Sequence, residues 1–278
     1  KAKQLLNVIK SGSTAGITPT TAPMKPTEPL TRIATLTKMY SYFKNAVHNS
    51  QPAREYISSR ALDYTKVEVG YNSGQFHHGT RREEALIQSC LQAGLLTEAG
   101  LSTKTGEKAY QVFGKWCIVF ALRNGQGQVT GLYLRSTVND KDQKHYYLKN
   151  REGLYPCYPQ PETKKLILTE AVIDGATLLQ IPAITSQYSI LACYGTNGLT
   201  EEHREALNQL KNLDEIIFAF DNDAAGNAAV KRYTQELAAQ LPQIKYSTLE
   251  LPENEDINST AQTHSLEIFP HLLEKRTE

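Results

Sequence analysis

The sequence contains few cysteines and no long hydrophobic run, and each shortage excludes a class of protein. The four cysteines of the 278-residue chain are far apart and form no Cys-x-x-Cys pair: Cys90, Cys117, Cys157 and Cys193. This spacing excludes a zinc site built from paired cysteines, and it predicts reduced thiols in a cytoplasmic protein. No hydrophobic run has the length of a membrane span and no secretory signal is visible, so we expect no contact with a membrane.

Net charge is also nearly absent, but the value of +1 conceals two oppositely charged halves. Residues 1–160 contain 21 Lys and Arg against 11 Asp and Glu, whereas residues 161–278 contain 9 against 18. A basic half is typical of a protein that binds a polyanion such as nucleic acid, and an acidic half can hold cations. The alternative is that the two halves have solvated surfaces of different composition and nothing more.

The hydrophobic content, 40% of the residues, suffices for a sizeable core, which we expect to be divided between two compact units. Residues 1–35 are rich in Thr, Pro, Ser and Gly and are interpreted as a linker or a surface arm. The sequence begins at Lys1 rather than Met, which indicates a piece of a longer protein.

The first half has the pattern of a small α+β unit. Residues 36–60 have helical spacing in two pieces, the second opening at Pro52, and residues 81–94 predict a helix that ends at Gly94. Asn124-Gly125 is a strong hairpin signal between two of the predicted strands. The strands expected here are residues 116–122, 129–136 and 145–148, with a short strand within 62–75.

From residue 164 onward, strands and helices alternate, which favours a parallel sheet covered by helices. The expected strands are residues 165–169, 190–194, 215–220 and 245–251. The expected helices are residues 174–181, a helix that opens after Thr200, and residues 227–241. The fold class expected for the chain is therefore α/β, preceded by the smaller α+β unit.

Acidic residues follow three of these strands. Glu170 ends the first strand, the pair Asp221-x-Asp223 ends the third, and Asp256 follows the fourth. Because ligands bind at the carboxyl ends of the strands in open α/β sheets, we expect these acids to line one site. Two carboxylates about 4 Å apart repel by roughly 4 kcal/mol at an effective dielectric of about 20, so they share a proton or hold a cation. Oxygen ligands favour Mg²⁺ or Mn²⁺.

Other interpretations of the Asp pair fit less well. An EF-hand loop needs an oxygen side chain and a Glu at positions that hold Ala225 and Arg232 here. An aspartyl-phosphate phosphatase usually has Thr at the position of Ala225. Helix capping explains any one of the acids, since Asp and Glu favour first helical turns, but it explains three acidic strand ends less simply.

Several other conspicuous residues are interpreted as structural. The aromatic residues of the predicted strands are expected in the core rather than stacked on bases: Trp116, Tyr133 and Tyr147. The adjacent His77 and His78 are expected in a loop without a metal, because neighbouring side chains of a strand point apart. His203 is expected on the exposed face of a helix.

Together these motifs resemble the toprim domain of bacterial-type DNA primases. The acidic element Glu170–Asp174, the loop 194–200 and the segment 220–226 are similar to the family's Glu-Gly-x-x-Asp, Leu-Gly-Thr and Asp-x-Asp-x-Ala-Gly elements. Four segments of the first half are also similar, in the family's order: residues 53–62, 69–71, 127–135 and 147–150. The first of these contains Arg60-Ala-Leu where the family has Arg-Gly-Leu, and the resemblance runs from about residue 36 to residue 258.

The sequence departs from the family at several positions. Ala171 stands in place of the Gly after the first Glu, Asn258 in place of a second acid after Asp256, and Tyr146 in place of a basic residue. No Cys/His zinc module precedes the core and no helicase-binding domain follows it within this sequence. Such divergence suggests a phage, plasmid or mobile-element member of the family.

The resemblance implies a toprim parallel sheet flanked by helices at residues 161–258. It also implies a basic α+β subdomain of the primase core at residues 36–160 and a C-terminal helical tail at residues 259–278. The implied activity is nucleotidyl transfer, in which RNA primers are made from NTPs on a single-stranded DNA template. A replicative helicase is an implied partner only through domains outside this chain.

The family's functional residues map onto named positions of this sequence. Glu170, Asp221 and Asp223 are implied to be the catalytic metal ligands for Mg²⁺ or Mn²⁺, and Asp174 and Asp256 are second choices as ligands. Glu170 is alternatively a general acid or base. Gly195 and Thr196 are expected at a phosphate of the NTP, since a glycine lets the backbone approach closely. The residues expected along the template are Lys115, Arg123, Arg135, Lys144 and Lys149.

Rival functions use the same residues differently. A toprim nuclease hydrolyses phosphodiesters without any NTP. A non-catalytic nucleic-acid-binding module, inactivated through Ala171 and Asn258, binds DNA without turnover. A third alternative is a structural domain of a larger replication protein.

Overall fold

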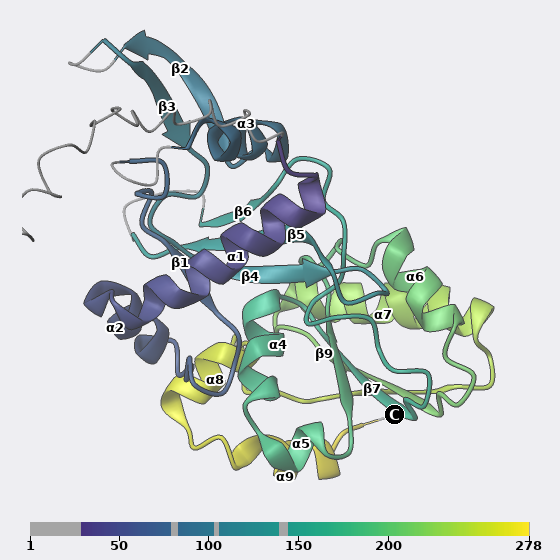
Figure 1. Cartoon of the computed structure of the whole chain (residues 1–278). Helices are drawn as coiled ribbons and strands as arrows, with labels where there is room; N and C mark the ends of the chain where they lie inside the picture. Colours follow the sequence, from purple (N-terminus) through teal and green to yellow (C-terminus); the bar gives the residue numbers. More distant parts are fainter. Residues whose placement is uncertain (1–28, 79–82, 103–105, 139–143, 278) are drawn as a thin grey trace, which may run out of the picture.

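The structure, a computed structural model, describes residues 29–78, 83–102, 106–138 and 144–277. Figure 1 shows an antiparallel sheet with its helices in the upper part and a parallel sheet between helices in the lower part. Most of the arm expected at residues 1–35, and the first two residues of the helix expected at 81–94, lie outside the described residues. Within the described ranges, no helix combines the length and the apolar character that a membrane span needs.

The upper unit is built on an antiparallel sheet in the order β1-β4-β5-β6. Asn124 closes the hairpin between the two central strands, because its side chain accepts hydrogen bonds from the N–H groups of Gln126 and Gln128 at 3.1 and 3.0 Å. The predicted Asn-Gly hairpin is confirmed. The three longer predicted strands are also confirmed, to within one residue at each end. The strands are β1 (Gly70–Asn72), β4 (Cys117–Arg123), β5 (Val129–Ser136) and β6 (His145–Tyr147).

Three helices accompany this sheet: α1 (Arg32–His48), α2 (Gln51–Ser59) and α3 (Glu84–Ala93). The hydroxyl of Thr31 accepts a hydrogen bond from the N–H of Ala34, so α1 begins four residues before the predicted position 36. This cap was not predicted, because Thr31 lies in the Thr-rich segment that was interpreted as a linker. Ser50 caps α2 in the same way, and Gly94 ends α3 in the left-handed conformation, as predicted.

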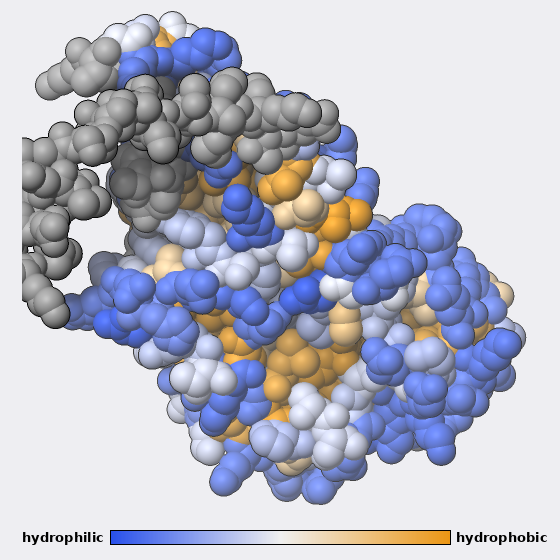
Figure 2. Space-filling model, in the orientation of Figure 1, coloured by the Kyte–Doolittle hydropathy of each residue, from blue (hydrophilic) through white to orange (hydrophobic). Residues whose placement is uncertain are grey.

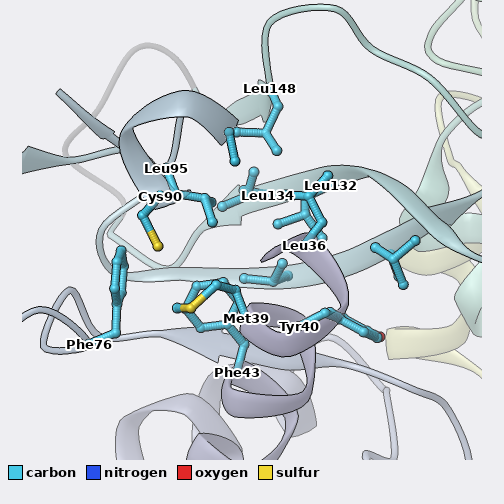
Figure 3. Packing of buried hydrophobic residues seen from close by; sticks show 14 of the residues in the cluster. Leu36, Met39, Tyr40, Phe43, Phe76, Cys90, Leu95, Leu132, Leu134 and Leu148 are labelled. Atoms are coloured by element: carbon cyan, nitrogen blue, oxygen red, sulfur yellow. The ribbon is translucent and has the colours of Figure 1, made fainter. Parts of the chain in front are cut away.

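An apolar stripe of α1 packs across one face of the sheet (Figure 3). Leu36, Met39 and Phe43 recur at helical spacing and are at most 2% exposed, and they meet Leu134 of β5 in one cluster. Burial of each such side chain contributes roughly 1.5–3 kcal/mol to stability. The helix approaches β1 so closely that a Cβ at Gly70 would lie 2.7 Å from the Cβ of Phe43, which explains the glycine.

One hairpin of the upper unit was not predicted. It consists of β2 (Leu96–Ser102) and β3 (Lys108–Val112), which pair with each other only, and Figure 1 shows it projecting from the body. Its residues are mostly exposed, and Leu101 is 74% exposed. Only the base of the hairpin packs on the core, through Leu96, Tyr110 and Val112. The segment therefore carries no sustained alternation of apolar and polar residues, which is the signal for a strand.

The lower unit contains a four-stranded parallel sheet in the order β10-β9-β7-β8. All four predicted strands and their parallel arrangement are confirmed. The first strand has the predicted range, and the other three end one to three residues earlier than predicted. The strands are β7 (Lys165–Thr169), β8 (Ser189–Ala192), β9 (Glu215–Ala219) and β10 (Lys245–Thr248). The helices of this unit are α4 (Val172–Leu179), α5 (Pro182–Thr185), α6 (Glu201–Asn208), α7 (Ala224–Gln240), α8 (Ile257–Thr263) and α9 (Ile268–Glu274).

Successive residues of the parallel strands face opposite layers of helices. Leu168 and Phe218 belong to the cluster that α6 and α7 cover, whereas Ile167 and Ile217 belong to the cluster that α4, α5, α8 and α9 cover. Both faces of the sheet are therefore buried, which explains the continuous apolar runs of β7 and β9 in the sequence. The carboxyl edge of the sheet is the side that meets the upper unit (Figure 1).

The two units share a hydrophobic core. Phe120 and Tyr133 of the antiparallel sheet pack in one cluster with Val172 and Ile173 of α4. A backbone bridge between Tyr155 and Ala192 adds main-chain pairing across the same junction. Figure 2 shows apolar surface near the middle of the visible face. A cavity of about 450 Å³ lies at this junction, and its lining includes Tyr40, Ala121, Tyr155 and Leu179.

Two expectations about single side chains were wrong. His203 is fully buried rather than exposed, because its Nε2 donates to the carbonyl of Ala192 at 3.0 Å while Nδ1 accepts from Thr200. Trp116 is 44% exposed rather than part of the core. It precedes β4 in a turn with a φ of 61°, which directs its side chain away from the sheet, and the ammonium of Lys115 lies 4.4 Å from the ring centroid. Tyr133 is fully buried, as expected.

The turn after α2 generates a prediction about stability. Ala61 has a φ of 52°, a region in which the Cβ of an L-residue costs roughly 1–2 kcal/mol. Glycine removes this cost and adds about 0.5–1 kcal/mol of backbone entropy in the unfolded chain. We expect Ala61→Gly to raise the free energy of unfolding in urea by about 0.5–1 kcal/mol. Ala228→Gly, on the exposed side of α7, should instead lower it by about 1 kcal/mol, and equal signs would contradict the prediction.

Candidate active site

Two carboxylates leave the parallel sheet side by side at its carboxyl edge. β7 and β9 are neighbours, and their last residues, Thr169 and Ala219, are paired in register. Glu170 follows β7 directly, and Asp221 stands two residues after β9. The side chain of Glu170 accepts a hydrogen bond from the backbone N–H of Asp221. The pairing of the two strands therefore fixes the proximity of the two acids.

Burial and mutual repulsion raise the pKa values of both carboxyl groups. Burial raises the pKa of Glu170 to about 7, and the charges of Asp221, Asp223 and Asp256 contribute to the shift. Burial likewise raises the pKa of Asp221 to about 6, with contributions from Asp256 and Asp223. We call these four residues and Asp174 the acidic cluster. Protons therefore occupy part of the acidic cluster near neutral pH unless a cation replaces them.

Two members of the acidic cluster also cap helices. The carboxylate of Asp223 accepts a hydrogen bond from the N–H of Gly226 at 2.7 Å and starts α7. Asp256 accepts one from the N–H of Ser259 and starts α8. The capping interpretation considered for the sequence therefore holds for these residues, and it coexists with their place in the cluster.

Asp174 lies beneath the other acids. It is 2% exposed, and its two oxygens accept hydrogen bonds from the N–H groups of Ala171 and Asn258 at 3.3 and 3.1 Å. Burial raises its pKa well above the ordinary range, and the charges of Asp256 and Asp221 add to this effect. Asp174 therefore holds the segment that follows Glu170 and is not directed to solvent.

The donor set of the acidic cluster fits a hard divalent cation. All of its donors are carboxylate oxygens, and Oε2 of Glu170 is buried without a hydrogen-bond partner. Among the described residues, no three acidic, histidine or cysteine side chains are arranged to hold an ion by themselves. Mg²⁺ commonly binds through one or two carboxylates, with water and substrate phosphates as its other ligands. This arrangement matches that mode rather than a cage made of protein groups.

The loop after β8 lies against Glu170. The N–H of Gly195 donates to the carbonyl of Glu170 at 2.9 Å, and Gly195 has a φ of 95°. The guanidinium of Arg232 on α7 donates to the carbonyl of Thr196 at 2.6 Å. The loop is thus adjacent to the acidic cluster, but the N–H of Gly195 is already bound and is not available to a phosphate.

Arginine side chains gather at the neighbouring end of the antiparallel sheet. Arg135 donates to Nε2 of His145, and Nδ1 of His145 lies 2.7 Å from the hydroxyl of Tyr133. Burial lowers the pKa of His145 to about 4, and the charges of Arg135, Arg60 and Lys144 lower it further. The Nε atoms of Arg60 and Arg135 are both buried without a hydrogen-bond partner. Unpaired donors on two neighbouring arginines are typical of a site that binds an anion.

The comparisons with known proteins agree with this geometry. A family model described as Toprim-like matches residues 167–261. A DNA primase of Borreliella burgdorferi is 29% identical over 211 residues, which are 70% of this chain and 38% of that protein. A DNA primase domain from Pseudomonas aeruginosa has a TM-score of 0.69 at 23% identity and covers 88% of this chain and 79% of its own. The DnaG primase catalytic domain bound to ssDNA has a TM-score of 0.66 at 20% identity, covering 88% of this chain and 81% of its own.

The chain is similar over most of its length to the catalytic core of bacterial-type DNA primases, and part of it matches the Toprim-like family. Its sequence relatives, its parallel sheet and the position of its acids at the carboxyl edge all support this assignment. The chain spans about two fifths of the length of the curated primases it matches.

The basic residues expected along the template do not form one group in this structure. Arg135 and Lys144 flank His145, and Lys115 lies at the same end of the sheet beside Trp116. The other two lie elsewhere. Arg123 ends β4 and forms an ion pair with Glu68 at 2.5 Å, and Lys149 follows β6, where its carbonyl accepts from Arg32. Among these five residues, Arg123 is the one whose charge is neutralised most directly within the chain, by Glu68.

Two arginines near the site were not predicted from the sequence. Arg60 lies in one of the segments that resemble the family, but nothing in the sequence indicates that the end of α2 lies beside β5 and β6. Arg151 is exposed, and its guanidinium lies 4.8 and 4.4 Å from the ring centroids of Tyr147 and Tyr194. Tyr147 belongs to the upper unit and Tyr194 to the loop that lies against Glu170, so Arg151 spans the junction next to the acidic cluster.

The raised pKa of Glu170 generates a prediction about stability and pH. Between the ordinary value of 4.5 and the folded value of about 7, the folded chain binds more protons than the unfolded chain, so stability falls as pH rises through this window. Glu170→Gln removes the charge, and we expect it to raise the free energy of unfolding at pH 8 in EDTA by about 1–2 kcal/mol. This value is reduced for solvent screening, because the carboxyl is only half-buried.

Urea unfolding of the wild type and the variant at pH 4 and pH 8 measures this effect. The two proteins should differ little at pH 4, where the carboxyl is protonated in both states. Glu201→Gln, an exposed acid in the first turn of α6, is the matched control and should change stability by less than about 0.5 kcal/mol at either pH. An equal fall in stability with pH for the wild type and Glu170→Gln would contradict the prediction.

Proposed function

We propose that this chain synthesises RNA primers on single-stranded DNA by metal-dependent nucleotidyl transfer. The observation that carries the proposal is that Glu170 and Asp221 follow two adjacent strands and lie side by side. Both carboxyl groups have raised pKa values, and Oε2 of Glu170 is buried without a hydrogen-bond partner. The curated relatives named DNA primase and the fold of the primase catalytic domains support the choice of this reaction. One solved catalytic domain of this fold is described as bound to ssDNA, which supports the template.

In this proposal, Glu170, Asp221 and Asp223 hold one or more Mg²⁺ or Mn²⁺ ions. Ions held there would supply neutralisation of the triphosphate charge and activation of the attacking 3′-hydroxyl. Asp256 adds negative charge to the same site from the start of α8, and Asp174 orients the segment after Glu170 through the N–H of Ala171. With a pKa of about 7, Glu170 can instead exchange a proton with the reacting hydroxyl, and this is the alternative role.

The polyanionic partners are assigned to the basic side of the junction. Arg60 and Arg135 are partly exposed, and they bind phosphate groups through their guanidinium groups. Arg151 and the loop around Thr196 lie close enough to Glu170 to orient the triphosphate of an NTP. Lys115 and Lys144 extend the basic surface along the template, and Trp116 offers an exposed ring on which a base can stack. A replicative helicase would engage domains outside this chain.

Labelled NTP incorporation on single-stranded DNA tests the proposal. We expect short RNA products with Mg²⁺ or Mn²⁺, and we expect Asp221→Asn to reduce their yield by at least about 100-fold, because it removes a carboxylate from the metal site. Asp214→Asn is the matched control, since Asp214 is an exposed acid at the opposite end of the same strand, β9. It should retain the activity of the wild type.

Other outcomes of this assay favour the rival functions. Cleavage of the template by the wild type, without NTPs and not by Asp221→Asn, would establish a toprim nuclease. DNA binding with neither products nor cleavage would show that this chain alone acts as a binding module, and the proposed activity would then be wrong for it.

A further inference from the structure

Asn258 occupies the position where the family resemblance leads us to expect a second acid, and the structure shows why an amide is needed there. Its side chain is fully buried. Its Nδ2 donates to the carbonyl of Arg60 at 2.7 Å and to the hydroxyl oxygen of Thr177 at 2.8 Å. Thr177 donates its own hydroxyl proton to the carbonyl of Ile173 at 2.9 Å, so it can only accept from Asn258.

A carboxylate at position 258 could not make these contacts. It has no N–H to donate, and it would face two oxygen acceptors in a buried site. The backbone N–H of the same residue already binds Asp174, so a second negative charge would also lie next to a buried carboxylate. Asn258 is therefore not a metal ligand in this chain, and the strand end before α8 contributes one acid, Asp256.

A second buried amide side chain binds the turn that contains Arg60, residues 60–63. Gln180, which is 5% exposed, donates from Nε2 to the carbonyl of Ala61 at 2.7 Å. Its Oε1 accepts from the N–H of Asp63 at 3.1 Å. The turn 60–63 thus has three backbone groups bound by two side chains of the parallel-sheet unit, and it contains the left-handed Ala61.

This turn carries an arginine of the candidate anion site. Arg60 is the residue that ends α2, and its Nε is buried without a partner. Its charge acts on His145, which Arg135 contacts directly. Asn258 consequently touches both sides of the site: its side chain binds the backbone of Arg60, and its N–H binds Asp174 of the acidic cluster.

We infer that Asn258 and Gln180 are positioning residues that hold Arg60 beside His145 and Arg135, and thereby set the affinity of the candidate anion site for the phosphates of a nucleic-acid strand. The inference rests on the proposed function for the identity of the ligand. The placement of Arg60 itself does not depend on catalysis.

A double-mutant cycle between Asn258 and Arg60 tests the inference. Binding of a fluorescein-labelled oligodeoxythymidine to the whole chain is measured by anisotropy for the wild type, Asn258→Ala, Arg60→Ala and the double variant. We expect each single variant to weaken binding about 5- to 10-fold, the loss of one charged hydrogen bond to phosphate. The double variant should bind no more weakly than Arg60→Ala, because Asn258 acts through Arg60.

Matched variants separate positioning from loss of packing. Asn258→Asp keeps the shape of the side chain but loses both donors, so it should weaken binding at least as much as Asn258→Ala. Gln187→Ala is the control, because Gln187 is an exposed amide of the same unit whose Nε2 donates to the carbonyl of Ala183 at 3.1 Å rather than to Asn258 or to the turn. It should bind as the wild type does. If Asn258→Ala does not fold by circular dichroism, Gln180→Ala replaces it in the cycle.

A second readout does not require DNA. The imidazole of His145 is titrated by NMR in the same four proteins. Arg60→Ala should raise its pKa, and Asn258→Ala should raise it in the same direction without any further change in the double variant. Two results would overturn the inference. One is that the fold-changes of the single variants multiply in the double variant. The other is that Asn258→Ala folds and leaves both the oligonucleotide affinity and the His145 titration unchanged. If only the oligonucleotide fails to bind, while the His145 cycle is non-additive, the proposed function is wrong and the positioning role stands.

Discussion

The repulsion between Glu170 and Asp221 is the constraint on which the site depends. Backbone pairing of β7 with β9 brings the two residues together, and this pairing belongs to the most buried part of the lower unit. The fold therefore cannot relieve the repulsion by separating them. It is relieved instead by a proton, which the raised pKa values indicate, or by a cation. The fold therefore accepts a local loss of stability in order to keep the two carboxyl groups adjacent.

The first turns of two helices reduce the electrostatic cost of placing Asp223 and Asp256 in the acidic cluster. Asp223 and Asp256 each accept a backbone N–H at the beginning of a helix, where the aligned peptide dipoles favour negative charge. Capping and ligand binding are often treated as competing explanations of an acid at a strand end. Here the two are compatible in one carboxylate, because each cap uses one oxygen and leaves the other for a ligand. The acidic cluster can therefore hold several charges that solvent alone would not stabilise.

The sequence was sufficient to predict the parallel sheet, the β4–β5 hairpin and the acids at the carboxyl edge, because these follow from patterns within short segments. It failed where the partner lies far along the chain. The burial of His203 depends on the carbonyl of Ala192, and the place of Arg60 depends on β5 and β6. Trp116 was assigned to the core because it adjoins a buried strand, but the positive φ of that residue reverses the expected direction of its side chain.

Two departures from the family pattern, Ala61 and Asn258, are explained together because they meet at the same junction. Ala61 in a left-handed turn is less stable than glycine by itself, and Asn258 removes an acid from the cluster. Yet the two positions are connected: Asn258 and Gln180 bind the carbonyls of Arg60 and Ala61, one on each side of the left-handed residue, and hold the turn against its strain. An acid at position 258 would release the carbonyl of Arg60, so a change at either position would favour a change at the other. The exchange of a charge for an amide near the acidic cluster is thus explained by the hydrogen bonds that hold the Arg60 turn.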